Sequence, residues 1–325
     1  MEELETRVSD CYSLLNGMSS DYPVGMMVFD GCFVVELLRQ VCIDESGENL
    51  RHSSLISEDN RLIASLMRDL LLMENQLPFF VLEKIFDICI KKGGKSDPLR
   101  LVALKLFITA IDPNFKVEHL LHLFHYISSP ETITPTQQGY HRLSIQSMQC
   151  ATRLRRAGIK FKPRRSADSF LQIEFRNGVL EIPPITYDKI IDILINCVAW
   201  EQCHPDTSKC FSTYVDFMSY LIKSDKDVTF LREEGIIRSI RSPDQMIVDI
   251  FKNLANEVFY ADTDCYLSEQ VKEMEIYCSS NWVTLRRTYF SSPWAFISVA
   301  AATVVLVLTG IQTIMAILAY VKPPS

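Results

Sequence analysis

The chain has 325 residues, of which 48% are hydrophobic and 22% charged, so it can bury a core and is not a disordered polymer. Its formal net charge of -7 at pH 7 argues against a general nucleic-acid binder, because such proteins gain affinity by neutralising phosphates. The ten cysteines include no CxxC pair, and the chain begins with an acidic segment rather than an apolar run. These features predict reduced thiols in the cytosol and no secretory signal peptide.

Helical periodicity dominates the N-terminal half. Apolar residues cover most of the circumference of the segment before Pro78, which predicts a buried helix that ends there. Pro78 is tolerated in the first turn of the next helix, and Gly93-Gly94 are expected to end it. Helices are predicted over Leu62–Met73, Pro78–Ile90, Leu99–Ala110 and Val117–Ile127, with a loop over Pro130–Gly139.

A β-hairpin is predicted at about 169–183, where apolar and polar residues alternate around Asn177-Gly178. A two-residue turn sets the register, so Phe175 should oppose Leu180 and Glu174 should oppose Glu181. The apolar face must lie on a helical core, because an isolated hairpin is only marginally stable in water. Further helices are predicted over Tyr187–Glu201, Phe211–Ile222 and Pro243–Tyr260.

The run from Trp294 to Tyr320 contains no charged side chain. As a helix it is roughly 40 Å long, enough to cross a hydrocarbon core of about 30 Å. The expected fold is therefore mainly α: a helical globular domain with one small β-hairpin and a single C-terminal transmembrane helix. The predicted domain organisation is a soluble domain over 1–288, a juxtamembrane linker over 289–293, a transmembrane helix over 294–320 and a short tail over 321–325.

Charges beside the span predict its orientation. Arg286 and Arg287 precede it and outnumber Lys322 after it, which favours a cytosolic large domain by the positive-inside rule. The chain also has no acceptor sequence for N-glycosylation. We expect a single-pass C-terminal anchor in the plasma membrane or an endomembrane, with the lipid bilayer as the first partner.

Small and polar residues recur along one stripe of the span, and such stripes are the seams along which membrane helices pack. Gln312 is the most informative, because an amide in hydrocarbon needs a hydrogen-bond partner. Self-association is therefore an open alternative to a monomeric helix. The stripe comprises Ser298, Ala302, Val305, Thr309, Gln312 and Ala316.

Several segments resemble blocks of the plant domain-of-unknown-function 247 family, in the same order. They include LMRDLLLMENQLPFFVLEKIF, CATRLRRAGIKFK, FLQIEFRNGVLEIPPI, DVTFLREEGII and NWVTLRRTYFSSPWAFISVAAATVVLVLTGIQT. The resemblance covers Met1 to Tyr320, without the upstream IYRVP-like segment of most members. A short member, an alternative product and a truncated sequence are the three interpretations of this difference. The resemblance implies a mainly helical domain held to a membrane by its C-terminal helix, with no established catalytic residues. Some grass members are linked to pollen self-incompatibility, which implies recognition or signalling for part of the family.

Two candidate ligand sites have simpler explanations. Lys91–Ser96 ends like a phosphate-binding loop, but Cys89 stands where the motif needs its first glycine. His119, His122 and His125 share one helix face and include enough imidazoles for zinc, yet the spacing of three favours an ordinary polar face.

Two candidate catalytic groups are weak as well. Cys197, Cys203-His204 and Cys210 do not have zinc-module spacing, and structural packing with Cys197 on a buried face explains them better. Glu174 and Glu181 would form an acid–base pair only in a cleft; on a half-exposed hairpin they are two solvated charges. No catalytic residue, metal site or cofactor is predicted.

One dense basic stretch stands out in this acidic chain. An anionic membrane surface, an acidic protein partner and a merely solvated loop are the three interpretations, of which the loop is the simplest. The residues are Arg153, Arg155, Arg156, Lys160, Lys162, Arg164 and Arg165.

The sequence favours a non-enzymatic, membrane-tethered interaction or signalling protein with an unidentified protein partner. The alternative is a membrane-bound, hydrolase-like enzyme whose site is assembled from distant residues. A concave site with titratable groups of shifted pKa would favour the enzyme, whereas an exposed apolar or basic patch would favour the interaction protein. A nucleic-acid binder is disfavoured by the overall acidity and the apolar C-terminal run.

Overall fold

A computed structural model of the protein describes residues 7–8, 11, 21–46, 65–66, 68–90, 116–130, 148–258, 265–279 and 293–321. Over these ranges the chain is mostly helical, with a small sheet and one apolar C-terminal helix, which confirms the predicted fold class. The predicted helix over Leu99–Ala110, the segment Lys91–Ser96 and nearly all of the loop after Pro130 lie outside the described residues.

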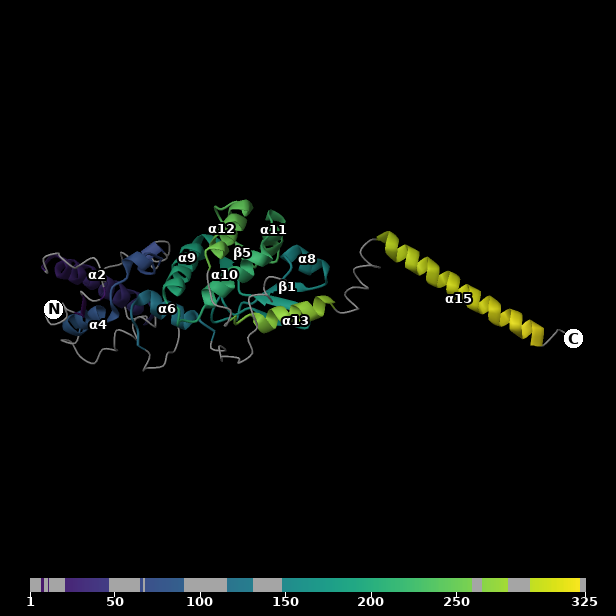
Figure 1. The fold of residues 1–325 in the computed structure, drawn as a ribbon, viewed down its shortest axis with the longest axis horizontal. Helices are drawn as coiled ribbons and strands as arrows, with labels where there is room; N and C mark the ends of the chain where they lie inside the picture. Colours follow the sequence, from purple (N-terminus) through teal and green to yellow (C-terminus); the bar gives the residue numbers. More distant parts are fainter. Residues whose placement is uncertain are drawn as a thin grey trace.

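The N-terminal part is built on α2 (Asp21–Ser46) and α4 (Phe79–Ile90), which pack against each other (Figure 1). α4 begins directly after Pro78 and ends at Ile90, as predicted. Before it, residues 65–66 and 68–70 are helical, and the 3-10 turn η2 (Met73–Asn75) follows. α2 has no counterpart among the predicted helices.

α6 (Leu120–Ser128) joins two hydrophobic clusters. Leu121 belongs to the larger, C-terminal cluster, whereas Leu120 and Leu123 belong to the N-terminal one. The helix begins three residues later than predicted, because the His119 imidazole caps it and accepts a hydrogen bond from the His122 N–H at 3.1 Å.

The hairpin is confirmed, but it belongs to a larger sheet. β2 (Glu174–Arg176) and β3 (Val179–Ile182) pair antiparallel in the predicted register. Asn177 and Gly178 both have positive φ, 50° and 77°, as the predicted tight turn requires. β1 (Lys160–Pro163) adds a third strand parallel to β3, so the sheet order is β1-β3-β2.

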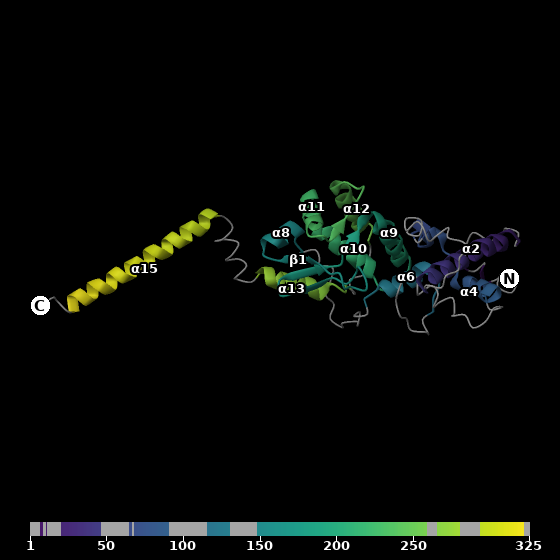
Figure 2. The same cartoon turned by 180° about the vertical axis from the view of Figure 1, so that it is seen from behind.

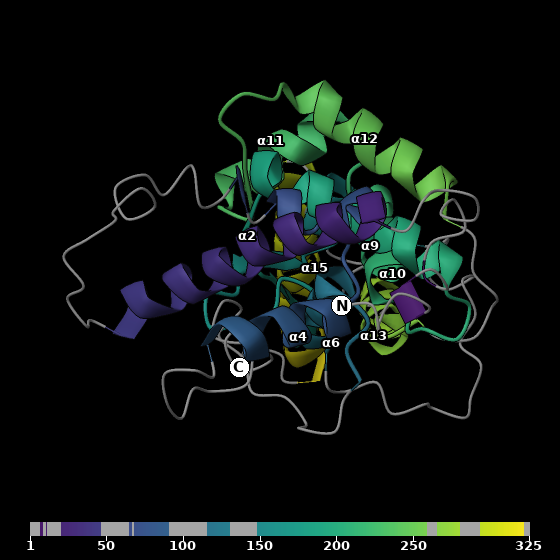
Figure 3. The same ribbon diagram turned by 90° about the vertical axis from the view of Figure 1, so that its left-hand side faces the viewer.

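The larger core is enclosed by α9 (Tyr187–Cys203), α10 (Cys210–Leu221) and α12 (Asp244–Asn256), whose bounds lie within a few residues of the predicted ones. Phe211, Tyr214 and Phe217 of α10 are completely buried. α11 (Asp225–Glu233) lies with α12 along one side of α9 and α10 (Figure 3). β4 (Ile185–Thr186) pairs in parallel with β5 (Ile237–Arg238), and α13 (Ser268–Ser279) packs on β2.

α15 (Pro293–Val321) extends away from the globular body (Figures 1 and 2). Among the described residues it is the one helix long and apolar enough to cross a membrane, with a mean hydropathy of 2.2 over Ala300–Leu318. None of that stretch is buried. An apolar helix of a soluble core would be mostly buried, so α15 is not a core helix.

Candidate functional site

The predicted basic residues gather at one end of the globular body, and we call this region the basic surface. Its elements are α8 (Ala151–Arg156), β1 and the turn after β1, so most of these residues lie on a helix and a strand rather than in the expected loop, although the stretch is solvated as that interpretation expects. α8, β1 and α13 form the end of the body nearest to α15 (Figures 1 and 2). The exposed members are Arg153, Arg155, Arg156, Lys160, Lys162 and Arg165.

A buried carboxylate, Asp227 of α11, holds α8 in position. It accepts hydrogen bonds from the N–H and hydroxyl of Thr152 at 2.9 and 2.7 Å. It also accepts bonds from the N–H and hydroxyl of Ser224 at 3.0 and 2.8 Å. Burial opposes ionisation of Asp227, but these hydrogen bonds outweigh burial and lower its pKa below the usual value. The arginines of α8 therefore project from a firmly fixed helix.

Two of the predicted basic residues have partners within the protein. The Arg155 guanidinium lies 4.6 Å from the centre of the Phe230 ring. Arg164 is half-buried, with its Nη1 2.6 Å from Oε2 of Glu174, and Arg176 pairs with the other oxygen of the same carboxylate. Glu174 therefore offsets one of the two positive charges of Arg164 and Arg176.

The predicted carboxylate pair lies on the sheet, with Glu174 opposite Glu181 as expected. Both side chains are half-buried on the face opposite the buried Phe175 and Leu180. The ion pairs of Glu174 make this a structural charge cluster, so the geometry gives no support to acid–base chemistry here.

Four histidines surround the buried indole of Trp200. The ring centroids of His122, His125 and His204 lie 5.0, 4.7 and 4.7 Å from that of the indole, and His119 lies at 6.1 Å. His125 is only 3% exposed. The predicted polar helix face is therefore wrong, because these imidazoles pack on an aromatic ring of α9. Among the described residues, no three His, Cys, Asp or Glu side chains converge as metal ligands.

The packing on Trp200 disfavours protonation of two of these imidazoles, His119 and His122. Burial, and then the neighbouring His122 and His204, lower the pKa of His119 from 6.5 to about 4. Burial also lowers the pKa of His122, although the carboxylate of Glu118 opposes it. Burial of His119 and His122 therefore favours their neutral forms.

Glu201 is a completely buried acceptor beside this cluster. Its Oε1 lies 2.7 Å from Nε2 of His125 and accepts the N–H of Phe211 at 2.9 Å. Its Oε2 accepts the N–H and hydroxyl of Ser212 at 2.8 and 2.6 Å. The carboxylate thereby caps the first turn of α10. Ser212 is buried and bonds the carboxylate rather than the imidazole, so these residues do not form a nucleophile–base pair.

The predicted cysteine cluster is dominated by packing. Cys197 is completely buried, as predicted, and burial raises its pKa well above the usual value. Burial raises the pKa of Cys210 to about 11. Thiols held in the protonated form are poor nucleophiles. Cys203 is exposed. The ring of the adjacent His204 stacks on the indole of Trp200.

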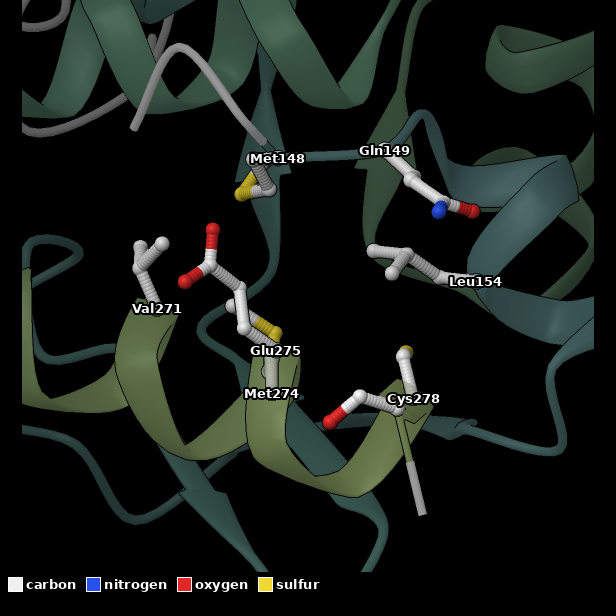
Figure 4. A pocket seen from close by; sticks show the side chains of 8 residues that line it. Met148, Gln149, Leu154, Val271, Met274, Glu275 and Cys278 are labelled. Carbon is white, nitrogen blue, oxygen red and sulfur yellow. The ribbon is translucent and has the colours of Figure 1, made fainter. Parts of the chain in front are cut away.

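A cavity of about 190 Å³ lies between α13 and the chain that leads into α8 (Figure 4). It is smaller than the ~300–1,000 Å³ of typical small-molecule sites. Burial, and then Glu275, raise the pKa of its Cys278 thiol, which disfavours nucleophilic chemistry. The lining residues are Met148, Gln149, Leu154, Val271, Met274, Glu275, Cys278 and Ser279.

The predicted packing stripe lies on the exposed surface of α15. The Thr309 hydroxyl donates to the Val305 carbonyl at 2.8 Å, so its donor is satisfied within the helix. The Gln312 amide is therefore the group best suited to bond a second helix. The other members of the stripe, Ser298, Ala302 and Ala316, are exposed as well.

The described chain is thus a mostly helical domain with an exposed basic end, followed by one apolar helix. Residues 1–308 match a family model described as a plant protein of unknown function, domain of unknown function 247, and the chain belongs to this family. The UPF0481 protein At3g47200 of Arabidopsis thaliana is 32% identical over 98% of this chain and 73% of its own length. The putative UPF0481 protein At3g02645 of the same plant is 25% identical over 49% of this chain and 31% of its own. No solved structure matches the chain significantly.

Proposed function

We propose that the protein is a membrane-tethered interaction or signalling module that acts without catalysis. α15 is the anchor, and the helical domain presents its surface beside the bilayer. The observation that carries the proposal is the apolar helix Ala300–Leu318, which has no charged residue and lies wholly outside the hydrophobic cores. Each Leu, Ile, Val or Phe in such a helix favours insertion by about 0.3–0.6 kcal/mol.

The short tether supports a role for the basic surface. α13 ends at Ser279 and α15 begins at Pro293, so the intervening segment reaches at most about 50 Å even when fully extended. A domain anchored in this way stays close to the bilayer. The exposed arginines and lysines at its near end suit the anionic lipids of a cytosolic leaflet, at ~1 kcal/mol per basic residue near the surface.

Lysine footprinting of the full chain in proteoliposomes tests this function. We expect Lys160 and Lys162 to react more slowly with an amine-modifying reagent in anionic vesicles than in neutral ones, with the difference lost in high salt. Lys84 on α4 is an exposed lysine at the opposite end of the body and serves as the internal control (Figure 1). Equal modification of all three lysines in both vesicle types would refute lipid contact and leave an acidic protein partner as the alternative.

A further inference from the structure

Cys32 on α2 and Cys89 on α4 are exposed free thiols on two helices that pack together. Cys89 is near enough to Cys32 to raise the pKa of the Cys32 thiol. The two residues are far apart in sequence, so the packing of α2 on α4 brings them together. Figure 3 shows the two helices as neighbours at the N-terminal end of the molecule.

The close approach of the helices has a clear cause. A Cβ atom at Gly31 would lie 2.4 Å from Cδ1 of Ile85, which is well inside van der Waals contact. The absence of a side chain at Gly31 therefore lets α2 lie close to α4 without displacing the Ile85 side chain. Cys32 follows Gly31 directly, and Cys89 lies one helical turn after Ile85, so both cysteines are close in sequence to this contact.

We propose that Cys32 and Cys89 form a reversible intramolecular disulfide, with a small-molecule disulfide such as oxidised glutathione as the oxidant. One protein thiolate attacks a sulfur of oxidised glutathione, forms a mixed disulfide and releases one glutathione thiolate. The second protein thiolate attacks the protein sulfur of the mixed disulfide and releases the other glutathione. Two electrons pass from the protein dithiol to oxidised glutathione, and the two thiol protons end on the two reduced glutathione molecules.

The environment of the pair affects both steps. Partial burial, and then the adjacent Cys89, raise the pKa of Cys32, so less of Cys32 is thiolate at neutral pH. The second attack is an intramolecular step, which the proximity of the two residues favours.

The disulfide would fasten α2 to α4. The part of α2 that flanks Cys32 exposes Met26, Phe29 and Phe33. Oxidation would hold this apolar stretch in its present position, whereas reduction would leave α2 attached by packing alone. The inference rests on the contact between the two helices and does not depend on membrane anchoring.

The test uses the full chain in detergent, equilibrated with graded mixtures of reduced and oxidised glutathione and then trapped with an alkylating reagent. We expect digestion of the oxidised chain to yield a peptide that links Cys32 to Cys89 and that dithiothreitol releases. The linked chain should carry two fewer alkylated thiols than the ten of the reduced chain.

Single substitutions separate this pair from the other exposed cysteines. Cys32→Ser should remove the link and leave glutathione attached to Cys89, whereas Cys11→Ser should leave the link unchanged. Absence of the Cys32–Cys89 peptide at every glutathione ratio would overturn the proposal. Links formed equally among other cysteines, or between chains, would overturn it too.

Discussion

A carboxylate that is removed from water loses several kcal/mol of hydration unless the protein replaces its hydrogen bonds. Glu201 receives that replacement from three residues on two helices: His125 of α6, and Phe211 and Ser212 of α10. Because Glu201 itself belongs to α9, one side chain ties together three helices that meet between the two hydrophobic clusters.

We predict that Glu201→Gln lowers the free energy of unfolding by about 1–3 kcal/mol, the usual cost of leaving a buried hydrogen-bonding group unsatisfied. The amide would direct a donor at groups that already donate. Urea denaturation of the full chain in detergent measures the change. Glu233→Gln on the exposed side of α11 is the matched control and should stay within about 0.5 kcal/mol; similar values for the two variants would disprove the role of Glu201.

The histidines around Trp200 predict a pH dependence. Since the pKa of His119 falls to about 4 on folding, the unfolded chain binds more protons between pH 6.5 and 4. Stability should therefore decrease as the pH is lowered through this window, by roughly 1–2 kcal/mol after allowance for partial exposure.

Denaturation at a series of pH values tests this dependence. His119→Asn retains a capping side chain at the start of α6 but does not titrate, so it should flatten the slope between pH 6.5 and 4. An unchanged slope in that variant would show that His119 is not the group responsible.

At the scale of whole elements, two features of the hairpin turn favour glycine at position 178: a positive φ and a close aromatic ring. Gly178 has a φ of 77°, and a Cβ there would lie 2.6 Å from the ring of Tyr277 on α13. Gly235 has a φ of 75° but no atom within 4 Å of such a Cβ. Alanine substitutions at these two glycines therefore separate the cost of backbone strain from the cost of steric conflict.

We predict that Gly235→Ala costs about 1 kcal/mol of unfolding free energy, from backbone strain alone. Gly178→Ala should cost about 1–3 kcal/mol more, because α13 must also move away from the hairpin. Urea denaturation of the two variants measures both values. Equal losses of unfolding free energy in the two variants would mean that the Tyr277 side chain moves aside at no cost in stability.

The packing stripe of α15 belongs to this scale too. In membranes, Gln312→Leu combined with Thr309→Leu should reduce the yield of crosslinked dimer several-fold. The double substitution removes the amide from the packing stripe and replaces a small residue with a larger one. Val307→Leu changes the opposite face of the helix and should leave the yield unaltered. An unchanged dimer yield in the double variant would exclude association through this stripe.

The sequence predicts elements well where local chemistry decides them. The hairpin follows from the Asn177-Gly178 turn and the alternation on either side of it, and the two-residue turn sets the register. β1 escapes prediction because it is short and pairs with β3 only through the tertiary fold. α2 does carry a helical signal, since Met27, Val35 and Leu38 are buried on one face, but the surrounding apolar residues and glycines obscure it.

The candidate sites differ in the same way. The basic surface is visible in the sequence because charge is compositional, but its attachment to Asp227 depends on a contact between distant helices. The cluster of Trp200, His204 and Glu201 has no local signature. Its members become neighbours of α6 only when the two hydrophobic clusters meet.

At the scale of the whole molecule, charge and apolar surface are separated along the chain. The basic surface occupies the end of the body nearest to α15, and the N-terminal helices occupy the other end (Figures 1 and 2). In the proposed arrangement, α15 lies in the bilayer, the basic surface faces the lipid headgroups, and α2 and α4 point away from the membrane.

Alkaline extraction of membranes from cells that express the full chain tests the anchor most directly. We predict that the protein stays in the membrane pellet after a high-pH carbonate wash and is released by detergent. Leu308→Arg combined with Ile311→Arg should release it, because each arginine near the helix centre costs about 3 kcal/mol of insertion. Full recovery of the wild-type chain in the soluble fraction after the wash would contradict the assignment of α15 as a membrane anchor.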